Sequence, residues 1–136
     1  MMTSRFLSAA FFIAACSSAV AESAVPSGKS KISYPAYDSI EASVRRGTIA
    51  FEHYCSLCHG MTAEGNGRAA KLYNPRPYNL RKSMMPDAYK EQIIRKGGKA
   101  MGRSEFMPPW GEELTNEQVL DIVNFLRTIA PPEAAK

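Results

Sequence analysis

The segment Cys55-Ser56-Leu57-Cys58-His59 carries the strongest chemical signal in the chain. Two cysteines three residues apart can serve thiol–disulfide exchange, bind zinc or attach a haem covalently, and the histidine directly after the second cysteine separates these uses. Both thiols can add to the vinyl groups of a haem, and the imidazole of His59 then lies under the iron as its first axial ligand. The spacing therefore predicts one covalently attached haem c.

The two competing interpretations of this motif fit the chain less well. A structural zinc ion needs four protein ligands, and besides Cys55, Cys58 and His59 the domain offers only His53. His53 precedes Cys55 by two residues in the same predicted helix and is badly placed to complete a tetrahedron. A thioredoxin-like motif follows a strand, whereas a predicted helix leads into Cys55.

A methionine is the expected second ligand of the iron. Met107 is the best candidate, because Pro108 and Pro109 preset the backbone and reduce the entropy cost of holding the thioether in place. Met107 as an ordinary core residue is the alternative. Met84 and Met85 are either an alternative loop ligand or simple loop packing, and Met101 is expected to cover the haem. Met61 follows His59 too closely to reach the opposite face of a haem.

The first predicted helix carries the motif. It begins at Asp38, where Asp38 and Glu41 form an N-capping pair, and it continues to the cysteines. Gly47 inside this helix costs about 1 kcal/mol relative to alanine. A glycine at such a position indicates the close approach of another helix.

Two further helices are predicted, and no alternating pattern predicts a strand, so the fold class is all-α. The middle helix begins at Pro86 as its first helical residue and ends at the pair Gly97-Gly98. The last helix runs from Thr115 to Ala130, with Gln118 completing a capping box. Its apolar residues recur at spacings of three and four and form one face.

The chain of 136 residues, 45% hydrophobic and 22% charged, fits one small domain. Residues 1–21 are predicted to be an export signal with cleavage after Ala21, which places the protein in the periplasm. The alternative is a lipobox ending at Cys16, which would be acylated as a lipid anchor. Residues 22–36 are a predicted flexible leader, 37–131 the folded domain and 132–136 a frayed tail. No apolar run reaches the roughly 18 residues of a membrane span.

Composition excludes some function classes. A net charge of +4 is too small for a typical nucleic-acid-binding protein, and three cysteines are too few for a disulfide scaffold. Residues 68–103 nevertheless contain ten basic side chains against Asp87 and Glu91. The ten are Arg68, Lys71, Arg76, Arg81, Lys82, Lys90, Arg95, Lys96, Lys99 and Arg103. This stretch is either a solvated surface or a face that steers an acidic redox partner.

Residues 47–130 resemble the class I c-type cytochromes, in particular small bacterial exported members with a single haem. The resemblance rests on four segments of this chain: Gly47 to Gly60, Gly65-Asn66-Gly67, Met107 to Gly111 and Asn124-Phe125-Leu126-Arg127. It implies a cytochrome c fold of three main helices and loops around one haem. The first and last helices of the family cross nearly at right angles, which implies that Gly47 lies near Phe125.

The resemblance also implies the environment of the haem. A backbone carbonyl in this family accepts the proton of the haem histidine. Many relatives have a proline where this chain has Arg68, which leaves Pro75 or Pro77 as candidates for the carbonyl that orients His59. The aromatic residues Trp110, Tyr73 and Tyr78 either bind or cover the haem propionates or simply pack.

The predicted function is one-electron transfer between exported redox proteins, a donor dehydrogenase and an acceptor oxidase or reductase, with His59 and Met107 on the iron and no enzymatic activity. The alternative is a cytochrome subunit bound tightly to a periplasmic dehydrogenase or reductase complex. In a third class, an enzyme or gas sensor, Met107 would be absent from the iron and a small ligand would bind there.

Overall fold

The computed structural model describes residues 35–131. The predicted signal peptide, the alternative lipid anchor at Cys16, nearly all of the leader and the tail lie outside the described residues. Within residues 35–131 the chain forms four α-helices, two short 3₁₀-helices and no strand, which confirms the all-α fold class. No helix in this part of the chain has both the length and the apolar character needed to cross a membrane.

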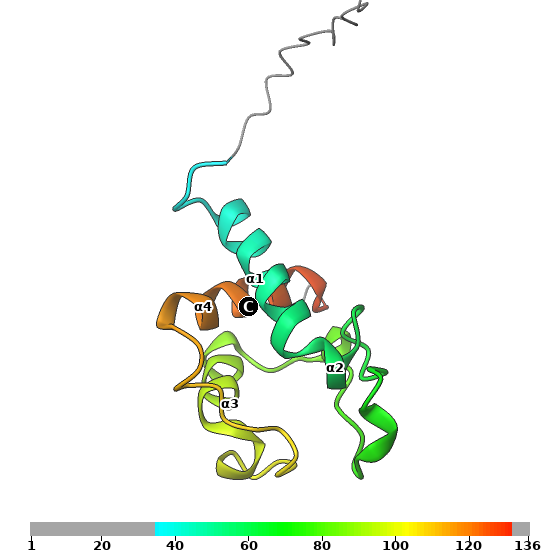
Figure 1. Cartoon of the computed structure of the whole chain (residues 1–136). Coiled ribbons are helices and arrows are strands. Elements are labelled where there is room, and N and C mark those ends of the chain that lie inside the picture. The colour runs from blue at the N-terminus through cyan, green and yellow to red at the C-terminus, as the bar shows by residue number, and fades with distance from the viewer. Residues whose placement is uncertain (1–34, 132–136) are drawn as a thin grey trace, which may run out of the picture. The chain divides into compact units, whose positions relative to one another are not determined.

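The three main helices of the prediction are present, joined by long loops (Figure 1). In chain order the elements are α1 (Ile40–Tyr54), α2 (Ser56–His59), η1 (Ala70–Leu72), η2 (Leu80–Lys82), α3 (Asp87–Ala100) and α4 (Asn116–Ile129). Helix α4 packs against α1, α3 and η2, and α2 contacts η1. Helix α4 is therefore the element around which the other main helices are arranged.

The first helix begins two residues later than predicted. Its N-cap is Ser39, whose hydroxyl accepts a hydrogen bond from the backbone N–H of Ala42 at 3.1 Å. Ser39 has the extended backbone that a cap requires, whereas Asp38 lies in the turn before it. The predicted capping pair of Asp38 with Glu41 was therefore wrong, although Glu41 still lies in the first turn.

The middle helix differs by one residue at its start and ends where the sequence indicates. Pro86 is the cap, with extended dihedral angles, and Asp87 is the first helical residue. At Gly97 the backbone leaves the helical region with φ 76° and ψ 168°, and one further turn runs to Ala100. The positive φ is accessible to glycine at little cost, so Gly97 determines where the regular helix stops.

The last helix has the predicted start. The Thr115 hydroxyl accepts from the Gln118 N–H at 3.2 Å, and the Gln118 side chain accepts from the Thr115 N–H at 2.9 Å, which completes the capping box. The helix buries Val119, Ile122 and Leu126 on one face, as its periodicity predicts. These residues form the core together with the α1 residue Phe51, whose ring lies 5.1 Å from that of Phe125.

Gly47 allows α1 and α4 to touch backbone to backbone. A Cβ at this position would lie 1.9 Å from the carbonyl oxygen of Asp121 and 3.0 Å from the N of Ile122. The close approach is as predicted. The predicted contact at Phe125 was wrong. The helices cross at Asp121–Ile122, which lies one helical turn earlier on α4.

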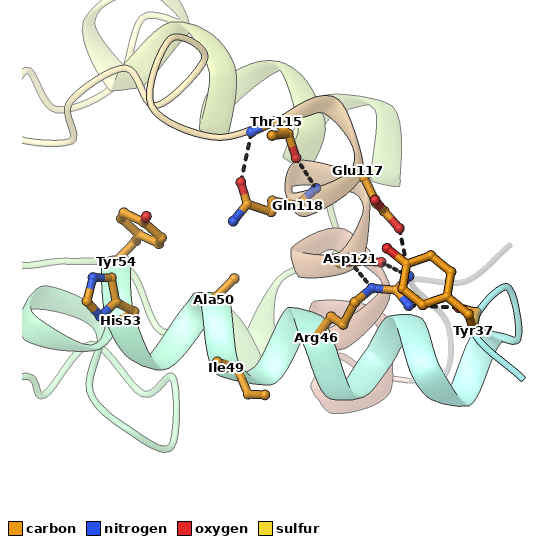
Figure 2. Close-up of a pocket in the computed structure, with 10 residues that line it drawn as sticks. All are labelled: Tyr37, Arg46, Ile49, Ala50, His53, Tyr54, Thr115, Glu117, Gln118 and Asp121. Carbon is orange, nitrogen blue, oxygen red and sulfur yellow. Dashed lines mark hydrogen bonds and ion pairs between the residues drawn. The ribbon is translucent and has the colours of Figure 1, made fainter. Parts of the chain in front are cut away.

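A buried polar network lies beside this crossing (Figure 2). Asp121 is 3% exposed, and its carboxylate accepts two hydrogen bonds from the Arg46 guanidinium, at 2.7 and 3.0 Å. It also accepts a hydrogen bond from the Ser43 hydroxyl, and the Asn124 amide donates to that hydroxyl at 2.7 Å. A buried carboxylate is tolerable only with such partners, so the network fixes how α1 lies on α4.

The crossing predicts the effect of adding one methyl group. Gly47→Ala increases helix propensity by about 1 kcal/mol, but it forces two backbones apart, and overpacking of this kind costs about 1–3 kcal/mol or more. We expect a net loss of stability, measured as a lower midpoint in denaturant unfolding of the protein. Ile49→Ala, on the same helix and 67% exposed, is the control and should change stability by less than about 0.5 kcal/mol. An unchanged or raised midpoint for Gly47→Ala would contradict the close approach.

Candidate functional site

The residues of the predicted haem motif lie together at the end of α1. Cys55 is the C-cap of α1, and α2 carries Cys58 and His59 in a single turn. The N–H of His59 donates to the carbonyl of Cys55 at 2.9 Å, which closes this turn. All three side chains line one cavity of about 520 Å³.

This cavity is a pocket with mostly apolar walls. The apolar side chains come from α1, η2, α3 and α4: Phe51, Leu80, Ile93, Ile94, Ile122 and Leu126. Its lining includes four basic residues and no aspartate or glutamate. An apolar interior with cationic groups and no acids suits a large flat apolar ligand that carries anionic substituents.

The His59 ring is oriented by a backbone carbonyl. Its Nδ1 lies 3.0 Å from the carbonyl oxygen of Tyr78, and because a carbonyl can only accept, Nδ1 carries the proton. Burial lowers the pKa of His59 and outweighs the opposite effect of the Tyr78 carbonyl. The imidazole is therefore neutral with a free lone pair on Nε2, the form that ligates a metal. The sequence predicted that the carbonyl of Pro75 or Pro77 would orient His59. This prediction was wrong, because the carbonyl that faces the ring belongs to Tyr78.

Cys55 and Cys58 are not joined by a disulfide, and both are half-buried in the cavity wall. Burial, with a smaller contribution from Cys58, raises the pKa of the Cys55 thiol to about 12. A redox-active cysteine pair needs a lowered pKa and a thiolate, so this environment does not favour thiol–disulfide exchange. Within residues 35–131, no group of three or more His, Cys, Asp and Glu side chains is arranged to hold a metal ion.

Met107 enters the cavity from a different segment of the chain, which α3 holds in place. The Met107 carbonyl accepts from the N–H of Gly98 at 2.9 Å, and the N–H of Trp110 donates to Ile94 at 2.9 Å. A Cβ at Gly97 would lie 2.9 Å from the Met107 carbonyl oxygen. The glycine pair therefore both ends the helix and makes room for the methionine loop.

The other candidate ligands are placed less favourably. Met84 and Met85 also line the cavity, but they are 52% and 38% exposed, whereas Met107 is half-buried and packs against the core. Met101 and Met61 are not among the lining residues. The structure thus reduces the candidates to three, of which Met107 is the most firmly held.

The three aromatic residues named from the sequence also line the cavity. Trp110 packs edge-on against Tyr54, with ring centroids 5.5 Å apart, and Tyr73 packs against Phe106 at 5.1 Å. The hydroxyl of Tyr78 donates to the carbonyl of Lys82 at 3.2 Å. Trp110 and Tyr73 thus have packing partners in the wall, and the Tyr78 hydroxyl already has a hydrogen-bond acceptor.

A second hollow, of about 440 Å³, lies where the start of α4 meets α1 (Figure 2). Its polar groups are largely paired with one another: Arg46 lies 3.2 Å from Glu117 and stacks on Tyr37 at 4.4 Å, besides its bonds to Asp121. His53 lines this hollow and not the larger cavity. None of the four predicted site residues lines the second hollow, namely Cys55, Cys58, His59 and Met107. The larger cavity, which all four line, is therefore the candidate functional site.

The sequence analysis missed two features of this cavity. The first is the Tyr78 carbonyl, which no side-chain pattern could reveal. The second is Lys90, a buried lysine in the wall, which appeared only as one member of the basic stretch. Its position four residues before Ile94 on the inner face of a predicted helix was the signal that could have located it.

Comparison with known proteins agrees with this chemistry. The family model described as "Cytochrome C oxidase, cbb3-type, subunit III" matches residues 42–126. A solved structure of a reducing HAO-like protein complex from Kuenenia stuttgartiensis is similar, with 25% sequence identity and a TM-score of 0.51. The match covers 62% of this chain and 41% of that chain, so this chain spans less than half of its length. No curated protein matched the chain.

The two cysteines predict a covalent cofactor. In the wild-type protein, haem should remain with the polypeptide through acid–acetone extraction, because a thioether survives conditions that release a coordinated haem. Cys55→Ala and Cys58→Ala should each remove one attachment and lower stability, and the double variant should retain no haem after extraction. Ser56→Ala, between the two cysteines, is the control and should remain fully loaded. Haem that extracts from the wild-type protein would refute the assignment of both cysteines.

Proposed function

The chain belongs to the family described as "Cytochrome C oxidase, cbb3-type, subunit III", a family of class I c-type cytochromes, and on this premise we propose that it is a periplasmic one-electron carrier with His59 and Met107 on its haem iron. Proteins of this family bind haem c covalently and transfer electrons. When bound, the haem supplies a ferric–ferrous couple that takes up and releases one electron.

The observation that carries the proposal is that one cavity gathers all four predicted site residues. Cys55 and Cys58 would hold the haem through thioether bonds. His59 would offer its Nε2 and Met107 its sulfur, from two segments of the chain that are separately anchored. The apolar wall and the absence of acidic residues among the lining side chains fit the ring and the propionates of a haem.

Each ligand has a defined task. The Tyr78 carbonyl keeps the proton on Nδ1 of His59, fixes the ring and increases the basicity of the other nitrogen. A methionine thioether favours the reduced iron and so raises the reduction potential. With His59 and Met107 both bound, the iron would have no open position for a substrate, which favours electron transfer over catalysis.

The opening of the cavity offers a place for a redox partner to dock. Three exposed basic residues belong to the cavity lining, namely Arg76, Lys82 and Arg103, together with the exposed apolar side chains Tyr78 and Phe106. Basic groups around apolar surface favour a partner with an acidic patch. Of the basic residues in the stretch 68–103, these exposed three and the buried Lys90 line the cavity.

A second candidate function is that of a permanently bound electron-transfer subunit of a larger enzyme. Two observations favour it: the matching family is described as a subunit of an oxidase, and the similar solved structure belongs to a multi-protein complex. The cavity and its ligands would serve both functions equally. The difference lies in whether the partner dissociates after each electron.

The ligand assignment predicts the behaviour of Met107→Ala. Loss of the thioether should abolish the weak far-red absorption band of ferric methionine-ligated haem, lower the reduction potential and allow carbon monoxide to bind the reduced iron. Met84→Ala and Met101→Ala are matched controls and should retain the band and exclude carbon monoxide. Carbon monoxide binding by the wild-type protein would instead indicate an open iron site and a sensor or enzyme.

A mobile carrier and a bound subunit should differ in kinetics. For a carrier, reduction by an acidic partner should slow as salt rises, since the Debye length falls from about 30 Å at 0.01 M to about 10 Å at 0.1 M. Arg76→Glu with Lys82→Glu should slow it about tenfold or more at low salt and leave the visible spectrum unchanged. Arg45→Glu, an exposed charge on α1 outside the cavity lining, is the control. Copurification with an oxidoreductase at fixed stoichiometry, together with a salt-independent rate, would favour the bound subunit.

A further inference from the structure

Lys90 is a buried charge in the wall of the candidate haem cavity. The residue is 6% exposed and lies on α3, where it lines the cavity alongside Ile93 and Ile94. Lysines are rarely buried to this extent unless they are paired, because removing an ammonium group from water is costly. The charge of Lys90 would therefore act on any group that the cavity holds.

The ion-pair partner of Lys90 is not itself a lining residue of the cavity. The ammonium donates to a carboxylate oxygen of Asp87 at 3.1 Å, and the other oxygen of Asp87 accepts from Nε of Arg127 at 2.8 Å. Burial would raise the pKa of Asp87, but the hydrogen bonds from Arg127 and Lys90 outweigh it and hold this pKa below its ordinary value. The carboxylate is therefore charged near neutral pH, and the three residues together carry one net positive charge.

The sign of the electric field in the cavity depends on which of these charges lines the cavity and on how strongly water screens each one. Lys90 belongs to the lining, whereas Asp87 and Arg127 do not. The side chains of Asp87 and Arg127 are 29% and 46% exposed, against 7% for Lys90, so water screens them more strongly. The same applies to Arg76, Lys82 and Arg103, which line the cavity but are exposed. Lys90 thus contributes the least screened charge of the lining.

We propose that the ammonium group of Lys90 raises the reduction potential of the haem in this cavity, and that Asp87 limits the size of this effect. The inference depends on the proposed function, because it requires a haem in the cavity. Ferric haem carries one more positive charge than ferrous haem, so a nearby cation destabilises the oxidised form relative to the reduced form. Lys90 would thus tune the potential through space, without coordinating the iron and without contacting a redox partner protein.

The test compares two variants that break the same ion pair. Lys90→Gln keeps an N–H donor for Asp87 but removes the positive charge, and it should lower the reduction potential. The expected change is about tenfold in the equilibrium constant for reduction, which is about 59 mV for a one-electron couple. Asp87→Asn removes the opposing negative charge and should raise the potential. A purely structural ion pair would give shifts of the same sign in both variants, since both would loosen the same contact.

Lys90→Arg retains the charge and should restore most of the wild-type potential. Lys99→Gln is the matched control, because the Lys99 side chain is 84% exposed at the end of the same helix and should leave the potential unchanged. An unchanged potential in Lys90→Gln, or shifts of equal sign in the two variants, would overturn the proposal. If Lys90→Gln does not fold, Asp87→Asn alone decides: a raised potential supports the proposal, and any other result overturns it. A wild-type protein without covalent haem would refute the proposed function itself.

Discussion

The contact between the backbones of α1 and α4 at Gly47 is the constraint on which the cavity depends. The approach is closer than any side chain at this position would permit, and the buried carboxylate of Asp121 holds it in one geometry through Arg46 and Ser43. It brings Phe51 of α1 against Phe125 of α4. Phe51 also lines the cavity, whose wall takes side chains from both helices.

The two proposed iron ligands are held by backbone hydrogen bonds and not by side-chain pairs. His59 is fixed through the carbonyl of Tyr78, and Met107 through Gly98 and the turn that follows α3. Backbone groups have fewer degrees of freedom than side chains, so both ligands can be presented at little entropic cost. This arrangement suits electron transfer, in which the ligand geometry has to persist in both oxidation states.

Charge is distributed unevenly around this site. Exposed cations at the opening act at long range, are screened by salt and are suited to guiding a partner. Lys90 is buried and largely shielded from solvent, and in our proposal its charge affects instead the reduction potential of the haem. In these proposals, basic residues from a single stretch of sequence take two roles, and their burial decides which role each one takes.

The sequence by itself determined the elements and the chemistry. The spacing of Cys55, Cys58 and His59 specified a haem motif, and the apolar periodicity of α4 with its capping box specified a helix, because both signals are local. Gly47 indicated a close helix contact without its partner, which the fold placed at Asp121 and not at Phe125. Only the tertiary structure decided that the Tyr78 carbonyl faces His59 and that Lys90 is buried beside the cavity. Every residue has a backbone carbonyl, so the sequence cannot indicate which one faces His59. The burial of a lysine depends on which elements pack over it.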